Sequence, residues 1–454
     1  MTRMTRRLTP TAGLGRRRFL QAAGLALAGG MLGGCAGVGR GAPDNTADDG
    51  RPIERLEWWS NHPGGSRDVE LELIARYEEQ HPGITVTLVD AGKDYDEIAQ
   101  KFNAALTGAD LPDIVVLSDV WWYNFALNEQ IAPVSTLAGD AGVDTSAFVD
   151  SLYADYLLGG EHYALPFARS TPLFYYNRDA WRAAGLPDRG PETWPEMAEF
   201  GRRLQEKAPE FQPMGWYDSS GNLSWIVQAV AWENGGGYSD DWDFTLTSEP
   251  TIEAVSWFQD ATAPGDGWSY ISSALEGDFS AGITASGVMS TGSLAGLSEY
   301  ATFPIGTAPL PDNTPAGSCP TGGAGLAVPA NLPRRRQLEA LKFIDFVTSP
   351  ENTAYWSREV GYMPVRDAAL DLPEQRRFLA DNPNFRTAID QLPRTRPQDL
   401  VRTGLPGADP RLGGALEEIA VGREDVARTL GRVENTLGLV FDNQVAPLLD
   451  SRDT

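Results

Sequence analysis

The sequence predicts an α/β protein with more than one lobe and an open, largely parallel sheet. Strand-like and helix-like apolar patterns alternate from residue 53 to residue 117, which is the order of an open α/β sheet. The chain then continues to residue 454, too far for one hydrophobic core, so two or three lobes are expected. A hydrophobic content of 42% is enough to bury such cores and argues against global disorder.

The elements of the first lobe follow from local periodicity. In chain order they are a strand over 53–59, a helix with its apolar stripe at 69–77, a strand over 84–88, a helical stripe at 98–106 and a strand over 114–117. His81-Pro82-Gly83 ends the first helix, and the next strand alternates strictly between apolar and polar residues. Ile114–Leu117 is wholly apolar, as in a buried parallel strand. Ligands of such sheets bind at the carboxyl ends of the strands.

The remainder of the chain differs from the first lobe in composition and pattern. Residues 170–318 are rich in tryptophan and glycine turns and are expected to form most of a second lobe. A strand is predicted over 325–329, followed by two helices with apolar positions between 338 and 355. The last 80 residues read as helices interrupted by Pro-Gly breaks.

The first 35 residues predict export and lipid attachment. Gly15–Leu20 holds paired arginines before Phe-Leu, typical of a twin-arginine signal, and small residues before Cys35 are typical of a lipoprotein cleavage site. Residues 1–34 would thus be a signal peptide, with Cys35 lipidated and 35–52 a flexible tether. The apolar stretch is short for a membrane span; a weak transmembrane anchor or a cytoplasmic protein is the alternative.

The charge and the cysteines limit partners and chemistry. Residues 1–34 hold six arginines and no acid, so their removal would change the formal net charge from −25 to −31. This balance argues against nucleic acid and against electrostatic adhesion to anionic lipid. Cys319 would then be the remaining cysteine, and we expect a small buried residue rather than a nucleophile. Three histidines argue against a His-rich metal site, and no cofactor or metal is expected.

The search for catalytic motifs gives little. The sequence has no G-x-S-x-G, H-E-x-x-H, G-x-x-x-x-G-K or C-x-x-C motif. The acidic stretches 94–96 and 240–243 could hold a cation, but they lack the spacing of a calcium loop, and solvated surface is the simpler interpretation. We therefore predict that the protein is not an enzyme.

Two blocks resemble the family 1 extracellular solute-binding proteins of ABC importers. They are Tyr163–Asn177 (YALPFARSTPLFYYN) and the pair Gly322–Pro329 with Gly361–Arg366. The resemblance implies a two-lobed periplasmic-binding-protein fold of type II, with the ligand cleft between the lobes. It places 53–165 and 320–367 in the first lobe, and 166–319 and 368–454 in the second. The implied partners are a small-molecule ligand and the membrane permease; we expect a monomer.

Four shorter pieces look like the UgpB-like branch of this family, which binds glycerol 3-phosphate or glycerophosphodiesters. They are Trp59–Gly64, Asp90–Tyr95, Ser290–Gly296 and Cys319–Gly323. Actinobacterial members with this pattern are similar to glycerophosphocholine binders. A monoanionic diester also suits an acidic protein better than a dianionic phosphate does. The resemblance thus implies a receptor that delivers glycerophosphodiesters, glycerophosphocholine above all, to a permease.

Eight positions match ligand contacts of this branch, and we predict them as binding residues. They are Tyr95, Asp119, Ser170, Trp225, Ser290, Gly323, Tyr362 and Arg402. The match assigns the phosphate side to Tyr362 and Arg402, whose guanidinium suits phosphate oxygens, and hydroxyl donors near the phosphate to Ser170 and Ser290. Gly323 would offer a backbone N–H.

The match places a hydrogen-bonding tyrosine at Tyr95 and a glycerol-hydroxyl acceptor at Asp119. It places a head-group aromatic at Trp225, ahead of Trp121 and Trp122. Each position also has a purely structural interpretation: packing at a helix start for Tyr95, an N-cap for Asp119, turn residues for the serines, core for Trp225, and an ordinary surface arginine for Arg402.

Two other functions stay open on the sequence. An oligosaccharide receptor would use tryptophans to stack on sugar rings, although Arg402 and the Ser290–Gly296 match argue against it. A secreted glycerophosphodiesterase would need clustered carboxylates and histidines around a metal, and His62, His81 and His162 show no such grouping in sequence.

Overall fold

The computed structural model describes residues 52–108, 110–220, 222–312 and 317–452, all within one compact unit, Asn45–Thr454. The predicted signal peptide, the lipidation site Cys35 and the tether up to residue 51 lie outside the described residues. No helix in the described part of the chain is long and apolar enough to cross a membrane.

The first sheet contains the predicted N-terminal strands. Its order is β2-β1-β3-β15-β6, and the strands are β1 (Arg55–Ser60), β2 (Thr85–Asp90), β3 (Ile114–Ser118), β6 (Leu165–Ser170) and β15 (Gly322–Ala327). β1 runs parallel to β2 and β3, whereas β15 is antiparallel to β3 and β6. Every residue of β3 is buried, which confirms the buried strand predicted from its apolar run.

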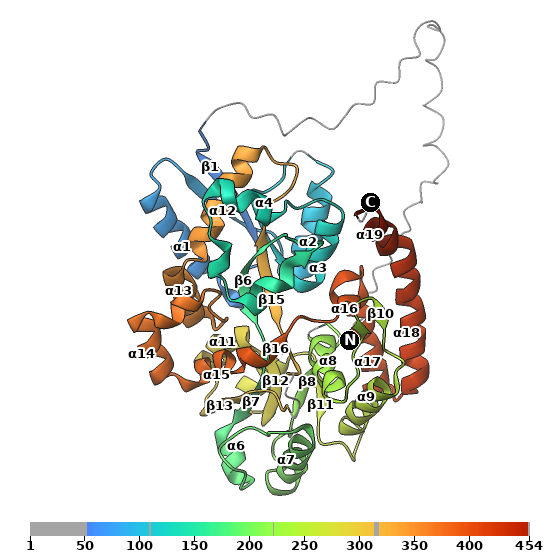
Figure 1. The fold of residues 1–454 in the computed structure, drawn as a ribbon. Coiled ribbons are helices and arrows are strands. Elements are labelled where there is room, and N and C mark those ends of the chain that lie inside the picture. The colour runs from blue at the N-terminus through green and yellow to red at the C-terminus, as the bar shows by residue number, and fades with distance from the viewer. Residues whose placement is uncertain (1–51, 109, 221, 313–316, 453–454) are drawn as a thin grey trace, which may run out of the picture. The chain divides into compact units, whose positions relative to one another are not determined.

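Helices follow the strands as the sequence predicts. Those of this part are α1 (Arg67–Gln80), α2 (Tyr95–Ala105), α3 (Asp119–Leu127), α4 (Val134–Ala141), α5 (Asp150–Tyr153), α12 (Arg334–Val347) and α13 (Pro350–Val360). α1 ends before His81, and α2 begins after Asp94, whose carboxylate accepts a hydrogen bond from the Glu97 N–H. The predicted βαβα order is therefore confirmed, and Figure 1 shows these helices around the first sheet.

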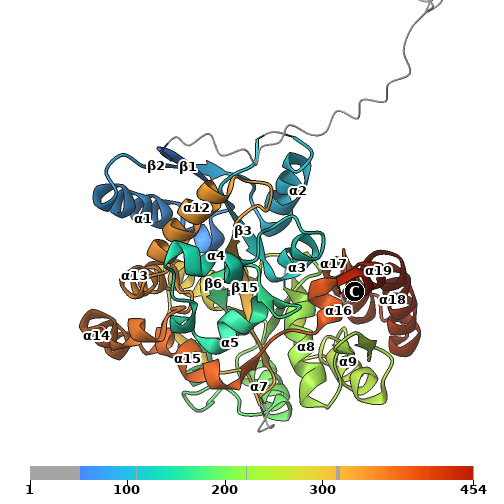
Figure 2. The same ribbon diagram turned by 45° about the horizontal axis from the view of Figure 1, so that its top comes forward.

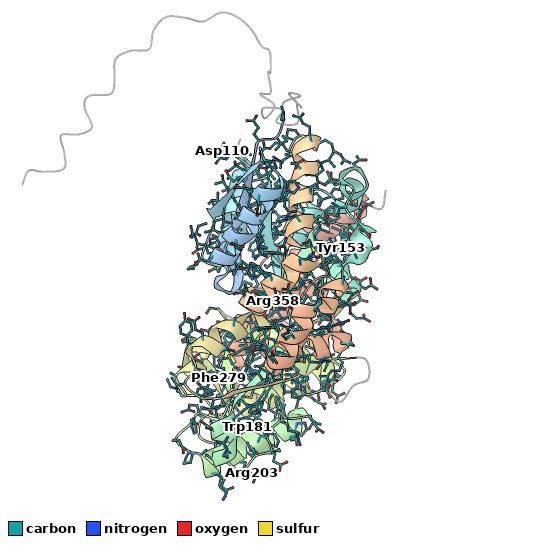
Figure 3. All side chains as sticks on the ribbon, turned by 90° about the vertical axis from the view of Figure 1, so that its left-hand side faces the viewer. Asp110, Tyr153, Trp181, Arg203, Phe279 and Arg358 are labelled. Carbon is teal, nitrogen blue, oxygen red and sulfur yellow. The ribbon has the colours of Figure 1, made fainter. Side chains whose placement is uncertain are left out.

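The second sheet lies in the tryptophan-rich part of the chain. Its order is β11-β8-β12-β7-β13, and the strands are β7 (Pro172–Asn177), β8 (Gly215–Tyr217), β11 (Tyr270–Ser272), β12 (Ser286–Ser290) and β13 (Ile305–Ala308). The helices of this segment are α6 (Arg178–Ala183), α7 (Trp194–Lys207), α8 (Leu223–Glu233), α9 (Glu249–Ala261), α10 (Leu275–Ser280) and α11 (Leu294–Tyr300). Figure 3 shows Tyr153 of α5 beside the first sheet, Trp181 of α6 beside the second, and Arg358 of α13 between them.

The C-terminal segment is helical, as predicted. Its helices are α14 (Pro373–Asp381), α15 (Pro383–Gln391), α16 (Leu400–Gly404), α17 (Ala408–Ala420), α18 (Val426–Val440) and α19 (Ala446–Arg452). The remaining short strands are β4 (Leu157–Leu158), β5 (Glu161–His162), β9 (Ser239–Asp240), β10 (Asp243–Phe244), β14 (Cys319–Pro320) and β16 (Thr395–Arg396). α16 packs against α3 and α17, which brings the C-terminal segment beside the helix that follows β3 (Figure 2).

Two sequence expectations can be compared with these elements. Residues 166–170, assigned from the sequence to the second lobe, lie in β6 and pair with β15 in the first sheet, so the change between sheets comes after Ser170. The rest of the lobe assignment stays a prediction. Cys319 is 2% exposed, which confirms a buried residue, and burial raises the pKa of its thiol to about 12.

Candidate ligand-binding site

A cavity of about 440 Å³ lies where loops of the two sheets and the C-terminal helices meet. All eight residues predicted as ligand contacts line it. Its other walls are Gly64, Asp94, Asp96, Ser118, Val120, Tyr217, Ser220, Asn222, Glu276, Gly292, Ser293, Gln398 and Asp409. The volume falls in the range of small-molecule sites. The structure therefore brings together eight predicted residues that are separated by up to 307 positions in the chain.

The ends of strands position several of these side chains. Asp119 follows β3 and begins α3, while Ser170 and Ser290 are the last residues of β6 and β12. Tyr95 begins α2 shortly after β2. Binding groups at the carboxyl ends of strands are what the sheet topology favours.

Asp119 belongs to a buried ionic cluster. Its Oδ1 lies 2.6 Å from Nη1 of Arg169, which also donates to the Tyr156 hydroxyl at 2.8 Å. Arg169 further pairs with Asp155, and its side chain is fully buried. Burial, opposed by Arg169, raises the pKa of Asp155 to about 6. The N-cap interpretation of Asp119 is wrong, because Ser118 occupies that position and the Asp119 carboxylate turns to Arg169.

Arg402 is 5% exposed, so its interpretation as a surface arginine is also wrong. Its Nε donates to the Ser224 Oγ at 3.0 Å, and Nη2 lies 2.8 Å from Oδ1 of Asp409. Nη1 donates to Oε1 of Gln398. Among the described residues lining the cavity, Arg402 is the one lysine or arginine. An anion entering the cavity would therefore find its positive charge here.

Gln398 connects the two charged ends of the cavity. Its Nε2 donates to Oδ2 of Asp119 at 2.8 Å and to the Thr321 carbonyl at 2.9 Å, while its Oε1 accepts from Arg402. The Gln398 side chain thus fixes the orientation of both the Asp119 carboxylate and the Arg402 guanidinium. Neighbouring polar groups held in this way are preorganised for a ligand.

Two tyrosines face each other in the cavity. Burial, together with the neighbouring Tyr362, raises the pKa of Tyr95 well above its usual value, and burial raises that of Tyr362 to about 12. Both phenols therefore stay protonated at neutral pH. The Tyr95 hydroxyl interacts with that of Tyr362, whereas the Ser118 hydroxyl is buried without a hydrogen-bond partner among the described residues. Buried polar atoms of this kind are rare and fit a ligand that would pair with them.

The other predicted residues shape the wall. Gly323 has φ +102°, and a Cβ there would lie 2.0 Å from the Ala168 carbonyl oxygen, so the position needs glycine. The Ser290 hydroxyl accepts a hydrogen bond from the Gly292 N–H, so it also serves its turn. Trp225 is 3% exposed, and its indole N–H donates to the Thr321 carbonyl at 2.9 Å. The side chain therefore both lines the cavity and belongs to the core. Trp121 and Trp122 are not among the lining residues.

The loop that carries Gly64 is tied down by a buried pair. The Nδ1 atom of His62 contacts Glu70, whose side chain is fully buried and also accepts from the Ser60 hydroxyl at 2.6 Å. The pKa of His62 is raised, chiefly by its hydrogen bond to Glu70. Burial opposes this shift, and the charges of Asp90 and Arg67 make smaller contributions that raise and lower the pKa, respectively. His62 has φ 53°, so this contact holds an uncommon backbone conformation.

This pair predicts a pH dependence of stability. A raised folded pKa contributes stability below the unfolded value near 6.5 and loses it as pH rises through the folded pKa. The destabilisation caused by His62→Gln should therefore shrink from pH 5.5 to pH 9 in thermal melts. His162→Gln is the matched control, because burial lowers the pKa of His162. The contribution of His162 to the stability of the fold therefore falls as the pH drops below 6.5, which is the opposite trend. Equal pH trends for both variants would contradict the prediction.

Sequence reasoning missed the residues that orient the predicted ones. Arg169 stands in a stretch that carries the family resemblance and Gln398 precedes Arg402 by four residues, yet nothing in the sequence pairs either of them with Asp119. No local sequence pattern marks Asp409, Ser224 or Glu276 as part of the site, since an isolated acid or serine on a helix usually faces solvent. A contact between Asp119 and Gln398 spans 279 residues and is visible only in the fold.

Comparison with known proteins shows the family of the chain. The family model of the bacterial extracellular solute-binding proteins matches residues 72–387. The sn-glycerol-3-phosphate-binding periplasmic protein UgpB of Escherichia coli (strain K12) is 28% identical over 358 residues, which is 75% of this chain and 81% of that protein. Its counterpart in Pectobacterium atrosepticum is 27% identical over 380 residues, covering 80% and 85%.

Solved structures agree. The crystal structure of UgpB from Mycobacterium tuberculosis in complex with glycerophosphocholine has 49% identity and a TM-score of 0.83, covering 86% of this chain and 99% of that one. The GacH receptor of Streptomyces glaucescens, solved with acarbose, has 18% identity, a TM-score of 0.75 and coverage of 87% and 100%, which shows the fold alone. The type II fold and the family predicted from the sequence are confirmed. The chain belongs to the bacterial extracellular solute-binding proteins, whose members capture small ligands outside the cytoplasm for ABC importers.

Proposed function

We propose that this protein captures glycerophosphodiesters, glycerophosphocholine foremost, and delivers them to the permease of an ABC importer. One observation carries the proposal: the eight residues matched to glycerophosphodiester receptors surround one cavity, and Arg402 is the one cationic side chain among its described walls. The similarity to a receptor crystallised with glycerophosphocholine supports the same ligand class.

The phosphate would bind at Arg402, beside Tyr362. The guanidinium already donates to Ser224 and Gln398, so its plane is fixed before the ligand arrives. Planar N–H groups pair with two phosphate oxygens at once. Ser170, Ser290 and the Gly323 backbone are proposed to supply further hydrogen bonds.

The glycerol hydroxyls would bind at Asp119 and Tyr95. Because Arg169 and Gln398 hold the Asp119 carboxylate, its remaining lone pairs face a defined direction. The Ser118 hydroxyl, which has no partner among the described residues, would gain one from the ligand. Trp225, whose indole donates to the same Thr321 carbonyl as Gln398, would present its ring to the ligand.

The charges around Arg402 favour a monoanionic diester over dianionic glycerol 3-phosphate. Asp409 lies 2.8 Å from the guanidinium, so the pair together carries no net charge. Four more acids line the cavity: Asp94, Asp96, Asp119 and Glu276. Asp119 pairs with Arg169 and Asp94 lies 4.0 Å from Lys93, but the second negative charge of a phosphomonoester would still meet Asp96 and Glu276.

This argument predicts a gain of binding. Asp409→Asn keeps the size and the hydrogen bonds of the side chain but removes its charge. It should strengthen the binding of glycerol 3-phosphate about tenfold more than that of glycerophosphocholine. Calorimetric titration at pH 7.5 measures both. Asp96→Asn, on the α2 side of the cavity, is the control for a lost pocket charge; equal weakening of both ligands in Asp409→Asn would mean that Asp409 only holds Arg402 in place.

Cleft closure would couple binding to delivery. We propose two lobes, 53–170 with 320–367 and 171–319 with 368–454, both of which contribute residues to one ligand. A ligand that contacts both lobes favours the closed state by its differential affinity. We expect a monomer without affinity for nucleic acid, consistent with the acidic composition.

Export and anchoring belong to the same proposal. The paired arginines of Gly15–Leu20 and the lipoprotein-type site at Cys35 support twin-arginine export and a lipid anchor on the outer face of the membrane. Cys35→Ser should release the protein into the soluble fraction, which fractionation of expressing cells would measure. Unchanged membrane association of the variant would refute the lipid anchor.

A ligand panel separates this function from its rivals. Thermal shift with glycerophosphocholine, glycerol 3-phosphate and maltose should give the largest stabilisation for the diester, about 2.7 kcal/mol at 100 times its dissociation constant. Stabilisation by maltose alone would turn the proposal into an oligosaccharide receptor. Release of choline or glycerol from the diester with added divalent metal would point to a phosphodiesterase instead.

A further inference from the structure

The backbone around Gln398 is firmly anchored, and the Gln398 side chain itself is 9% exposed. The carboxylate of the next residue, Asp399, accepts hydrogen bonds from the Trp232 indole and from the Tyr238 backbone N–H. The Asp399 backbone N–H donates to the Gln228 side chain at 3.1 Å. The chain that carries Gln398 is therefore fixed to α8 and to the residue before β9.

The partners of the Gln398 amide permit one orientation of that group. The Asp119 carboxylate and the Thr321 carbonyl accept hydrogen bonds from its Nε2, and neither can donate one. The Arg402 guanidinium donates to its Oε1 and cannot accept. A half-turn of the amide would break all three bonds, so each partner holds the amide in the orientation that the other partners need.

These partners come from different parts of the chain. Asp119 follows β3 and Thr321 precedes β15, two neighbouring strands of the first sheet. Arg402 lies on α16, four residues after Gln398. The amide therefore connects the first sheet with the C-terminal helices inside the cavity that it lines.

The amide is also the link between the two charges. The ion-pair partner of Asp119 is Arg169. That of Arg402 is Asp409, so the bonded path from Arg402 to Asp119 runs through the Gln398 amide. Hydrogen bonds in series polarise one another, and donation from the guanidinium to the amide oxygen makes the amide N–H a better donor to the carboxylate. A change at one end is therefore felt at the other.

We propose that Gln398 is a positioning residue that couples the two ends of the site, so that binding at Asp119 and binding at Arg402 strengthen each other. The inference rests on the proposed function, which places glycerol hydroxyls at Asp119 and the phosphate at Arg402. Such coupling favours a ligand that carries hydroxyls and a phosphate on one molecule over a ligand that offers either group alone.

A double-mutant cycle tests the coupling. Calorimetry would measure glycerophosphocholine binding to Asp119→Asn, Arg402→Lys and the double variant, first with Gln398 present and then in Gln398→Met, which keeps the length of the side chain without its amide. With Gln398 present, the double variant should bind at least about fivefold better than the product of the single losses predicts, because either change alone already disturbs the shared path. In the Gln398→Met background the losses should multiply to within about twofold. Gln100→Met, an exposed glutamine on α2, is the matched control and should keep the wild-type coupling.

Gln398→Glu is the second variant, and it separates the hydrogen bonds from packing. It keeps an oxygen for Arg402 but sets an acceptor against Asp119 and the Thr321 carbonyl, so glycerophosphocholine should bind at least about tenfold more weakly at pH 8. Burial and the Asp119 charge would raise the pKa of the new carboxyl, and Arg402 would oppose that shift. Protonation restores a donor, so the affinity relative to the wild type at the same pH should rise toward one between pH 8 and pH 5.5. Gln398→Met cannot titrate and should show no such recovery.

The outcomes separate this inference from the proposed function. A folded wild-type protein that does not bind glycerophosphocholine would refute the proposed function. If the wild type binds and the losses multiply with Gln398 present as they do in Gln398→Met, the two ends act independently; the inference is then overturned while the proposed function stands. Equal, pH-independent weakening in Gln398→Glu and Gln398→Met would also overturn it, since Gln398 would then act through its packing. A thermal melt of each variant controls for folding.

Discussion

Arg402→Ala should weaken glycerophosphocholine binding by at least about thirtyfold, because truncating a buried, hydrogen-bonded charge costs about 2–5 kcal/mol. The loss has two sources. The phosphate loses its cation, and Asp409, which now pairs with Arg402, is left facing the ligand as an uncompensated negative charge. Calorimetric titration would measure the change.

Arg402→Lys and Arg402→Ala/Asp409→Asn separate the two sources. Lysine keeps the charge but not the two-pronged donor, so an intermediate loss is expected. Removing the Asp409 charge in the alanine background should recover part of the affinity. Unchanged binding in Arg402→Ala would place the phosphate elsewhere in the cavity. A thermal melt of each variant controls for folding.

Arg169→Met should be the most destabilising single change near the site. The fully buried guanidinium pairs with Asp119 and Asp155, and removing it leaves two carboxylates without their cation. Breaking a buried ion pair in this way costs about 3–5 kcal/mol. Urea unfolding at pH 7.5 would measure the loss. Arg203→Met, an exposed arginine on α7, is a matched control and should change stability little.

The pH dependence of this variant distinguishes charge from packing. Buried carboxylates without a cation have raised pKa values in the folded state, so they add stability at low pH and lose it as pH rises. The deficit of Arg169→Met should therefore be smaller at pH 5 than at pH 7.5. An equal deficit at both pH values would mean that the arginine acts through its volume alone.

The sequence predicted much of the fold because local pattern is strong where one face of an element is buried. Residues 84–88 alternate and 114–117 are uniformly apolar, and both are strands of the first sheet. The family resemblance placed the change of lobe after residue 165, whereas residues up to Ser170 pair with β15 in the first sheet. Strands β6 and β7 are separated by Thr171 alone, so no turn signal marks the change from one sheet to the other.

The site was predictable as a set of positions but not as a network. The eight residues predicted from family resemblance do line one cavity. Periodicity and composition could not show that Gln398 bridges Asp119 and Arg402, because that bridge depends on α16 packing against α3.

The most direct measurement is a calorimetric titration of the purified protein with glycerophosphocholine, with maltose titrated in parallel. We predict saturable binding of one glycerophosphocholine per chain, no binding of maltose, and loss of the heat signal in Arg402→Ala. A folded wild-type protein that binds maltose and not glycerophosphocholine would contradict the proposal, and Arg402 would then be a structural partner of Asp409 alone.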